Sequence, residues 1–295
     1  MIDWVWLALR AAGFVLVLQA AGTAIFLHVF RARLMASAEP IRRAGRRLAL
    51  AALIVCIAQV FLEGAHMAGD WGGLTDPVLL RVAATSSVGR ALTVRAVGLV
   101  LLGASLWRIT PAPGACAFGA SLVVIVSFAL TGHTTVHAPR LLLATLLIAH
   151  LWLVAFWFGA LLPLRELARL ETGALAAHSI SAFSRIAVWL VPLIPLAGAG
   201  LALLLLPGPG ALWTPYGRLL CLKVMLFALL MVLAALNRQR YAPALERDDR
   251  GAAQRFRRSA ALEYLLVCAT LAATAAMTGF YSPGPDPAAS ATAQS

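Results

Sequence analysis

The sequence predicts an all-α protein, a polytopic integral membrane bundle of about eight transmembrane helices with both termini on the periplasmic side. Of its 295 residues 61% are hydrophobic and only 12% are charged, and its mean hydropathy is +0.87. A soluble domain has about 25% charged residues. Lipid must therefore be the solvent for much of the surface, and we expect a single transmembrane domain over residues 1–281.

Eight apolar runs are long enough to cross about 30 Å of hydrocarbon at a helical rise of 1.5 Å per residue. They lie near residues 4–30, 48–67, 91–108, 115–133, 141–164, 184–206, 217–236 and 260–280. Short connections separate them, with no room for a soluble domain. Residues 282–295, rich in Pro, Ala and Ser, are expected to form a disordered periplasmic tail.

Basic residues fix the predicted orientation, since Lys and Arg accumulate in cytoplasmic connections. The connections after the first and seventh runs are rich in arginine, and four more arginines fall on the same side by alternation. They are Arg31, Arg33, Arg42, Arg43, Arg46, Arg47, Arg238, Arg240, Arg247, Arg250, Arg255, Arg257 and Arg258, with Arg108, Arg165, Arg169 and Arg185. The net charge of +12 thus reflects orientation, and we expect no nucleic acid partner.

Two segments depart from simple spans. Residues 70–90 are too polar to cross a membrane and are expected to form a periplasmic loop followed by a short interfacial helix. The sixth run contains Pro192 and Pro195, which remove backbone donors and bend a helix. An ordinary kink is the favoured interpretation, and irregular backbone lining a cavity is the alternative.

Three of the six histidines fall at or near the predicted outer face. His133 and His137 lie between the fourth and fifth runs, and His66 ends the second run beside Met67. Imidazole and thioether together suit copper, because the soft thioether favours Cu⁺ while imidazole accepts both oxidation states. The spacing alone does not require a metal, because two histidines four residues apart also occur in ordinary loops.

Glu63 shares one face of the second helix with His66 and Met67, at positions i, i+3 and i+4. An acid about one turn inside a bilayer is costly and is a candidate for ion passage or proton relay. The structural alternative is a protonated Glu63 hydrogen-bonded to Gln59.

His150 lies about ten residues into the fifth run, near half the bilayer depth. A histidine there must face the bundle interior or a polar cavity. It could be a second metal station, a haem ligand, or a neutral imidazole bonded to a neighbouring helix. His28, near the inner end of the first run, and His178, in the expected cytoplasmic loop, are weaker candidates.

Motifs of soluble enzymes are not found in the sequence, which has no phosphate-binding glycine loop and no nucleophile elbow. We therefore expect no catalytic residues, and the protein is expected not to be an enzyme.

Several short stretches together resemble the copper-resistance D (CopD) family. These are Leu80 to Arg90, ending in Gly-Arg; His150 to Leu162, with a Trp-x-Gly-Gly segment in which Ala160 replaces the second Gly; Tyr216 to Lys223; Asn237 to Arg240; and Arg258 to Glu263. The resemblance covers residues 10 to 280 and is best over 80–280. It implies an eight-helix bacterial inner-membrane protein of copper homeostasis, moving copper from periplasm to cytoplasm with a CopC-type periplasmic copper-binding protein as partner. The carry-over to metal ligands is firmest for His150 and His133.

The sequence thus predicts copper uptake through an outer site of His66, Met67, His133 and His137 and then through His150. Glu63 is expected to balance charge or exchange a proton. The ion is Cu⁺ or Cu²⁺, and membrane lipid or further copies of the chain are other expected partners. Two alternatives stay open: a haem b electron-transfer protein with axial histidines, and a copper-binding scaffold or sensor without transport.

Overall fold

The computed structural model describes residues 1–107, 113–131, 140–206, 208–247 and 249–281, with the backbone alone described for 113 and 114. The long helices are α1 (Ile2–Phe30), α2 (Ala38–Ala68), α4 (Ser87–Trp107), α5 (Pro113–Val126), α6 (Arg140–Leu170), α7 (Gly173–Leu190), α8 (Leu193–Leu205), α9 (Pro215–Leu236) and α11 (Ala252–Phe280). Shorter elements are η1 (Arg31–Arg33), η2 (Trp71–Leu74), α3 (Pro77–Thr85), η3 (Ser127–Leu130), η5 (Pro209–Trp213), the π-helical η6 (Asn237–Tyr241) and α10 (Ala242–Glu246).

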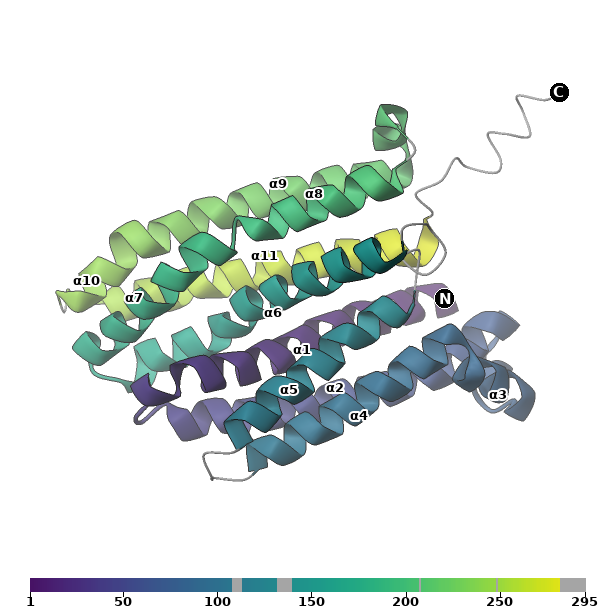
Figure 1. Ribbon diagram of the computed structural model, residues 1–295, viewed down its shortest axis with the longest axis horizontal. Coiled ribbons are helices and arrows are strands. Elements are labelled where there is room, and N and C mark those ends of the chain that lie inside the picture. The colour runs from purple at the N-terminus through teal and green to yellow at the C-terminus, as the bar shows by residue number, and fades with distance from the viewer. Residues whose placement is uncertain (108–112, 132–139, 207, 248, 282–295) are drawn as a thin grey trace.

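The helices run roughly along one axis, with α1 in the middle of the bundle (Figure 1). On one side of α1 lie α2, α4 and α5, and on the other lie α6 and α11. The outermost elements are α7 with α8, which pack on α6 and α10, and α9, which packs on α11. This arrangement confirms the predicted all-α membrane bundle.

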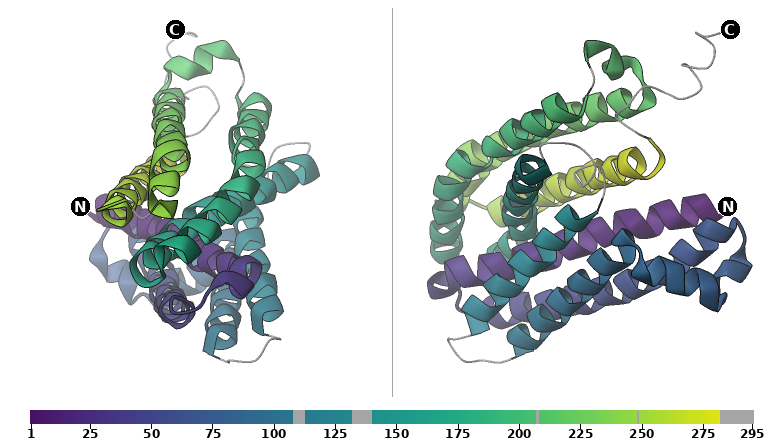
Figure 2. Two further views of the ribbon diagram at one scale, coloured as in Figure 1. Left: turned by 90° about the vertical axis from the view of Figure 1, so that its left-hand side faces the viewer. Right: turned by 45° about the vertical axis from the view of Figure 1, so that its right-hand side comes forward.

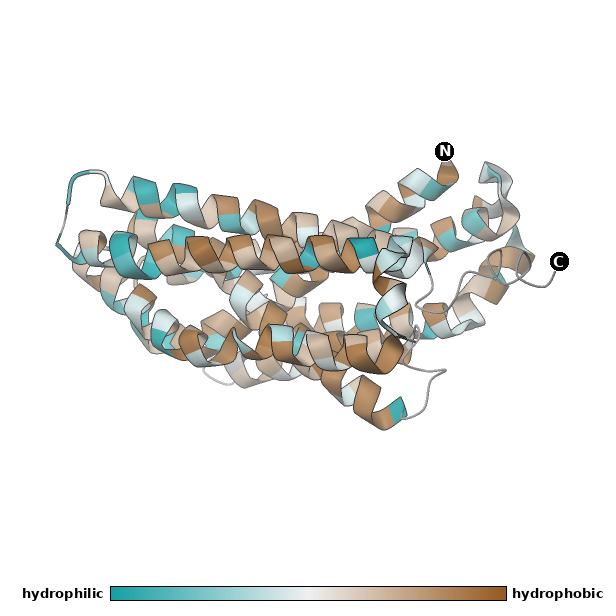
Figure 3. Cartoon of the chain, turned by 90° about the horizontal axis from the view of Figure 1, so that it is seen from above, coloured by the Kyte–Doolittle hydropathy of each residue, from teal (hydrophilic) through white to brown (hydrophobic). Residues whose placement is uncertain are grey.

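Seven helical segments in the described residues are long and apolar enough to cross a membrane. They begin at Ile2, Ala38, Ser87, Arg140, Gly173, Pro215 and Ala252, and a shorter apolar helix covers Ala115–Leu130 at the place of the fourth predicted run. Figure 3 shows apolar residues over the middle of the long helices and polar ones gathered toward the ends. In the described part of the chain, seven of the eight predicted runs therefore lie within candidate spans, and the fourth lies on the shorter helix.

The helical segment at the sixth predicted run begins before residue 184, where the predicted run starts. Helix α7 begins at Gly173, so His178 lies on an exposed helical face and not in a loop as predicted. The helix ends at Leu190, Val191 and Pro192 form a turn, and α8 starts at Leu193. Proline thus breaks this span into two helices. The short helix predicted within residues 70–90 is α3.

Helices α1 and α6 touch backbone to backbone at Gly22 and Gly159. A Cβ built on Gly22 would lie 1.9 Å from the Ala155 carbonyl oxygen, and one on Gly159 would lie 2.2 Å from Gly22 Cα. Only glycine permits this approach, as at small-residue interfaces of membrane helices. Gln19 Nε2 adds a hydrogen bond of 3.2 Å to the Gly159 carbonyl. The crossing joins the two sides of the bundle.

The first and last helices meet at one end of the molecule. The rings of Trp6 and Phe280 are 5.9 Å apart, and Arg10 donates to Thr278 Oγ1 at 3.2 Å. The start of α1 and the end of α11 therefore share one end (Figure 1). The arginine-rich connections lie at the opposite end, as the charge bias predicts.

At that opposite end, Glu171 ties together two connections of the chain. Its Oε1 accepts from the backbone N–H of Met35 and Ser37 at 3.0 and 2.8 Å, and from the Ser37 hydroxyl at 2.5 Å. Burial raises the pKa of this carboxyl, but the hydrogen bonds from Ser37, Met35 and Ala36 outweigh burial and hold its pKa below the ordinary value. The α1–α2 connection is thereby fixed to the α6–α7 connection.

Candidate functional site

Ionisable side chains of α1 and α2 gather at the end where α1 begins. The imidazole of His66 stacks on Trp6 with 4.6 Å between ring centroids. Its Nδ1 lies 3.2 Å from Asp3 Oδ1, an ion-pair distance without hydrogen-bond geometry. Trp6 Nε1 donates to Glu63 Oε2 at 2.9 Å. We name Asp3, Trp6, Glu63 and His66 the outer group.

Glu63 has a different partner from the one predicted as its structural alternative. Gln59 Nε2 donates to the Leu9 carbonyl at 3.1 Å, so this amide serves the α1 backbone. Glu63 accepts from Trp6 Nε1 instead. Met67, one residue after His66, is 48% exposed and extends away from the core.

Two cations, the half-buried Arg10 and the buried Arg95, lie farther along the same side of the bundle. The Arg10 guanidinium carbon sits 5.1 Å from the Trp6 ring centroid. Arg95, only 7% exposed, donates to Ser127 Oγ at 3.0 Å and lies 3.8 Å from the centroid of Phe128. Fixed guanidinium groups repel a passing cation, so the space between α1, α4 and η3 is unsuited to carry copper inward.

His133 and His137 lie outside the described residues. The chain that leads to them ends in η3, where Phe128 packs against Phe14 of α1 at 5.7 Å. Phe14 is about 12 Å along α1 from Trp6 at the helical rise per residue.

His150 of α6 faces two other helices, α8 and α9. Its Nδ1 lies 3.0 Å from the Ile194 carbonyl oxygen, and Cε1 is 3.4 Å from a Cβ position at Gly198. The Lys223 ammonium is near enough to repel a protonated ring. Because a carbonyl only accepts, Nδ1 carries the proton of a neutral ring, and Nε2 then holds the lone pair. A neutral Nε2 is a metal-ligating atom.

The described residues hold no group of three or more His, Cys, Asp or Glu side chains placed to bind one metal ion. His66 contacts α1, whereas His150 contacts α8 and is influenced by α9, and the two share no contact residue. Of the predicted ligands, only the adjacent His66 and Met67 are therefore together in the described part of the chain.

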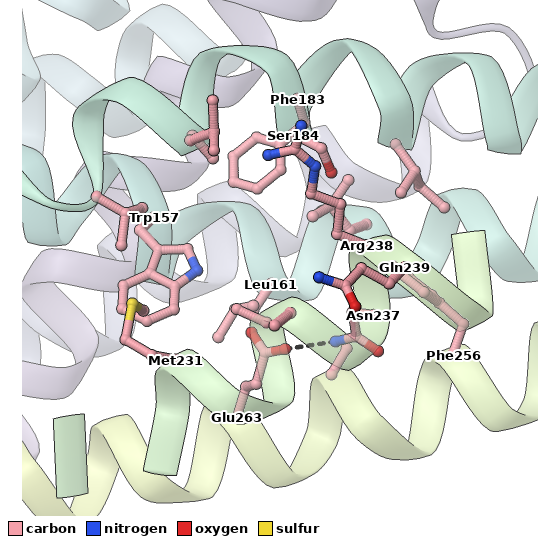
Figure 4. Close-up of a pocket in the computed structure, with 18 of the residues that line it drawn as sticks. Trp157, Leu161, Phe183, Ser184, Met231, Asn237, Arg238, Gln239, Phe256 and Glu263 are labelled. Atoms are coloured by element: carbon pink, nitrogen blue, oxygen red, sulfur yellow. Dashed lines mark hydrogen bonds between the residues drawn. The ribbon is translucent and has the colours of Figure 1, made fainter. Parts of the chain in front are cut away.

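A cavity of about 570 Å³ lies between α6, α7, α9 with η6, and α11. Glu263, 2% exposed, accepts a short hydrogen bond from Asn237 Nδ2 in its wall, and Asn237 Oδ1 has no partner (Figure 4). Both residues lie in stretches that resemble the CopD family, yet their spacing of 26 residues does not predict that they meet. The feature of the sequence that could have pointed to this site is Glu263, an acidic residue inside an apolar run.

Comparison with known proteins covers both ends of the chain. Residues 1–139 match the family described as copper resistance protein D-like, N-terminal domain, and residues 177–277 match copper resistance protein D. Copper resistance protein D of Pseudomonas syringae pv. tomato is 30% identical over 236 residues, which are 73% of this chain and 76% of that protein. The chain belongs to the copper resistance protein D family.

A second relative of this copper resistance family member is the inner membrane protein YebZ of Escherichia coli strain K12. It is 28% identical over 267 residues, covering 87% of this chain and 91% of YebZ. No solved structure matches the chain. Residues 140–176, with His150, lie between the two matched segments.

Proposed function

We propose that this protein is a copper transporter of the bacterial inner membrane, not an enzyme, and that it takes copper from the periplasm toward the cytoplasm. Family membership supports a copper-related membrane function. The relation to YebZ, by its printed name an inner membrane protein, supports the location. The basic connections at one end support an orientation in which the outer group faces the periplasm.

The observation that carries the proposal is the outer group. Two carboxylates and an imidazole from two helices meet at the end with the fewest basic connections. Stacking on Trp6 holds the His66 ring, and Asp3 lies beside its Nδ1, so Nε2 is the ring nitrogen proposed to bind the metal. In the proposed site His66 Nε2 and Met67 bind copper with His133 and His137, and Glu63 balances the charge or exchanges a proton.

His150 is the proposed inward station. Its neutral Nε2 is fixed in orientation by the Ile194 carbonyl. Since His150 and the outer group lie on different sides of α1, copper passes between them on the α6 side, away from Arg95. A CopC-type periplasmic protein is the proposed copper donor at the outer loops.

Copper content and copper uptake test the proposal together. We expect two purified variants, His150→Ala and the double variant His133→Ala with His137→Ala, to bind copper with at least about tenfold lower affinity than the wild type. Even residues that only support a metal ligand contribute this much. His178→Ala is the matched control, because His178 is exposed on α7. Elemental analysis measures binding, and cellular copper accumulation measures transport.

The alternatives predict different results in the same samples. A haem b protein would show a Soret band lost in His150→Ala. A scaffold or sensor would bind copper while accumulation stays equal to that of a deletion strain. Unchanged copper binding in all the histidine variants would contradict the proposed sites.

A further inference from the structure

Next to the cavity around Glu263 lies a smaller one of about 190 Å³, and the two share Ser184 and Arg238. The smaller cavity is also lined by Ser181, Arg185, Ala242, Pro243 and Glu246. The two cavities therefore adjoin, and we name them together the hollow; it reaches from the space between α6, α7, α9 and α11 toward the arginine-rich end of the molecule.

The large cavity is polarised along its length. Figure 4 places Trp157 and Met231 together at one end and Asn237, Arg238 and Gln239 at the other. Met231 and Asn237 are six residues apart, about 9 Å at the helical rise. The polar end, with the Asn237–Glu263 pair, is the end that continues into the smaller cavity through Arg238.

Arg185 and Arg238 are the basic groups of the hollow. Neither guanidinium forms an ion pair or a hydrogen bond in the described part of the chain, although other arginines at this end pair with Glu39, Glu166 and Asp249. Glu246 is the one carboxylate among the residues lining the smaller cavity, which leaves a net positive charge. Two unpaired guanidinium groups beside two serine hydroxyls match the oxygens of a phosphate.

The apolar part opens toward lipid. Helices α8 and α9 form separate arms joined by η5 (Figure 2), and they bury few residues. Large apolar side chains near the hollow face outward, including Trp189 at 79% and Val232 at 56% exposed. A volume of 570 Å³ lies within the range of about 300–1,000 Å³ that holds small organic ligands.

We propose that this hollow is a specific site for an anionic phospholipid of the leaflet at the arginine-rich end. The phosphate binds Arg185, Arg238 and the serine hydroxyls, and an acyl chain occupies the space between Trp157, Phe183 and Met231. Basic pockets between transmembrane helices on the cytoplasmic side bind anionic headgroups in this way. The site is independent of copper, so either proposal can fail alone.

Thermal stability of the full-length protein in detergent tests the site with three probes: dioleoyl phosphatidylglycerol, dioleoyl phosphatidylcholine and soluble glycerol 3-phosphate. A ligand that binds only the folded state raises the melting temperature as its concentration increases. Phosphatidylglycerol should stabilise the protein at far lower concentration than the other two probes.

Two variants and one control locate the effect. The Arg185→Gln with Arg238→Gln double variant should bind phosphatidylglycerol about 30-fold more weakly, since each such arginine contributes roughly five- to sixfold. Ala187→Phe, which keeps both arginines and fills the apolar wall, should also weaken binding. Arg31→Gln with Arg47→Gln removes the same charge from exposed positions that do not line the hollow and should bind like the wild type.

Three outcomes overturn the proposal. Equal stabilisation by phosphatidylglycerol and phosphatidylcholine means a non-specific lipid effect. Competition by glycerol 3-phosphate at matching concentration, with no effect of Ala187→Phe, means a phosphate site without an acyl chain. An equal loss in both double variants means only general electrostatic attraction to the basic end.

Discussion

The hydrogen bonds on Glu171 make the arginine-rich end of the bundle sensitive to acid. Because its pKa is lower in the folded than in the unfolded chain, the stabilisation is complete above the ordinary pKa of 4.5 and is lost as the pH falls through the folded value. The two connections that it joins should then separate first in acid.

Glu171→Gln should therefore lower the melting temperature of the purified protein at neutral pH, because the charged acceptor for the donors of residues 35–37 is lost. Its melting temperature should also decrease less than that of the wild type as the pH falls below 4.5. Glu166→Gln is the control, since Glu166 pairs with Arg169 on its own helix and with no other residue that the structure describes. An equal acid response in the wild type and Glu171→Gln would contradict this role.

At the outer group, the sequence predicted which residues share a helix face but not which residues of other helices they contact. The i, i+3, i+4 pattern correctly placed Glu63 and His66 on one face of α2. It could not supply Trp6 and Asp3, because these contacts come from α1, some sixty residues away along the chain. Gln59, one turn away on the same helix, was the partner named in the structural alternative for Glu63, but Gln59 donates to the Leu9 carbonyl of α1.

Among the helices, the crossing of α1 and α6 depends most strictly on residue size. Gly22→Ala would place a methyl group against the Ala155 carbonyl, and backbone on both sides leaves it no room. We expect a loss of about 1–3 kcal/mol, as for overpacked cores, visible as a lower melting temperature.

Gly119→Ala in α5 is the matched control for this substitution, since nothing lies within 4 Å of its Cβ position. It should be neutral or stabilising by up to about 1 kcal/mol through helix propensity. Equal stability of the two variants would show that α1 and α6 can move apart without cost.

Hydropathy located the spans well because burial in lipid requires a continuous apolar run. It missed the start of α7, since His178, Ser179 and Ser181 interrupt the apolar residues of 173–183 and lower the local hydropathy. Ala176, Ala177 and Ile180 are buried whereas His178 is exposed. The helical spacing of the buried positions was the signal for this extension of the helix.

For the whole molecule, the distribution of arginine predicts which side each end faces. An alkaline phosphatase reporter fused after residue 281 should be active, because the enzyme folds only in the periplasm, and one inserted after Arg250 should be inactive. Because Trp6 contacts Phe280, the start of α1 must lie on the same side of the membrane as the reporter fused after residue 281. Activity of the second reporter but not the first would reverse the orientation and move the outer group to the cytoplasm.

Assembly of the whole bundle is also linked to the order of synthesis. Helix α1 leaves the ribosome first, and it is the most enclosed of the spans, with 67% of its apolar window buried. Its polar residues Arg10 and Gln19 have partners in α11 and α6, which are made much later. Until those helices insert, α1 holds polar side chains without their final partners, and its place at the centre is complete only when the last helix arrives.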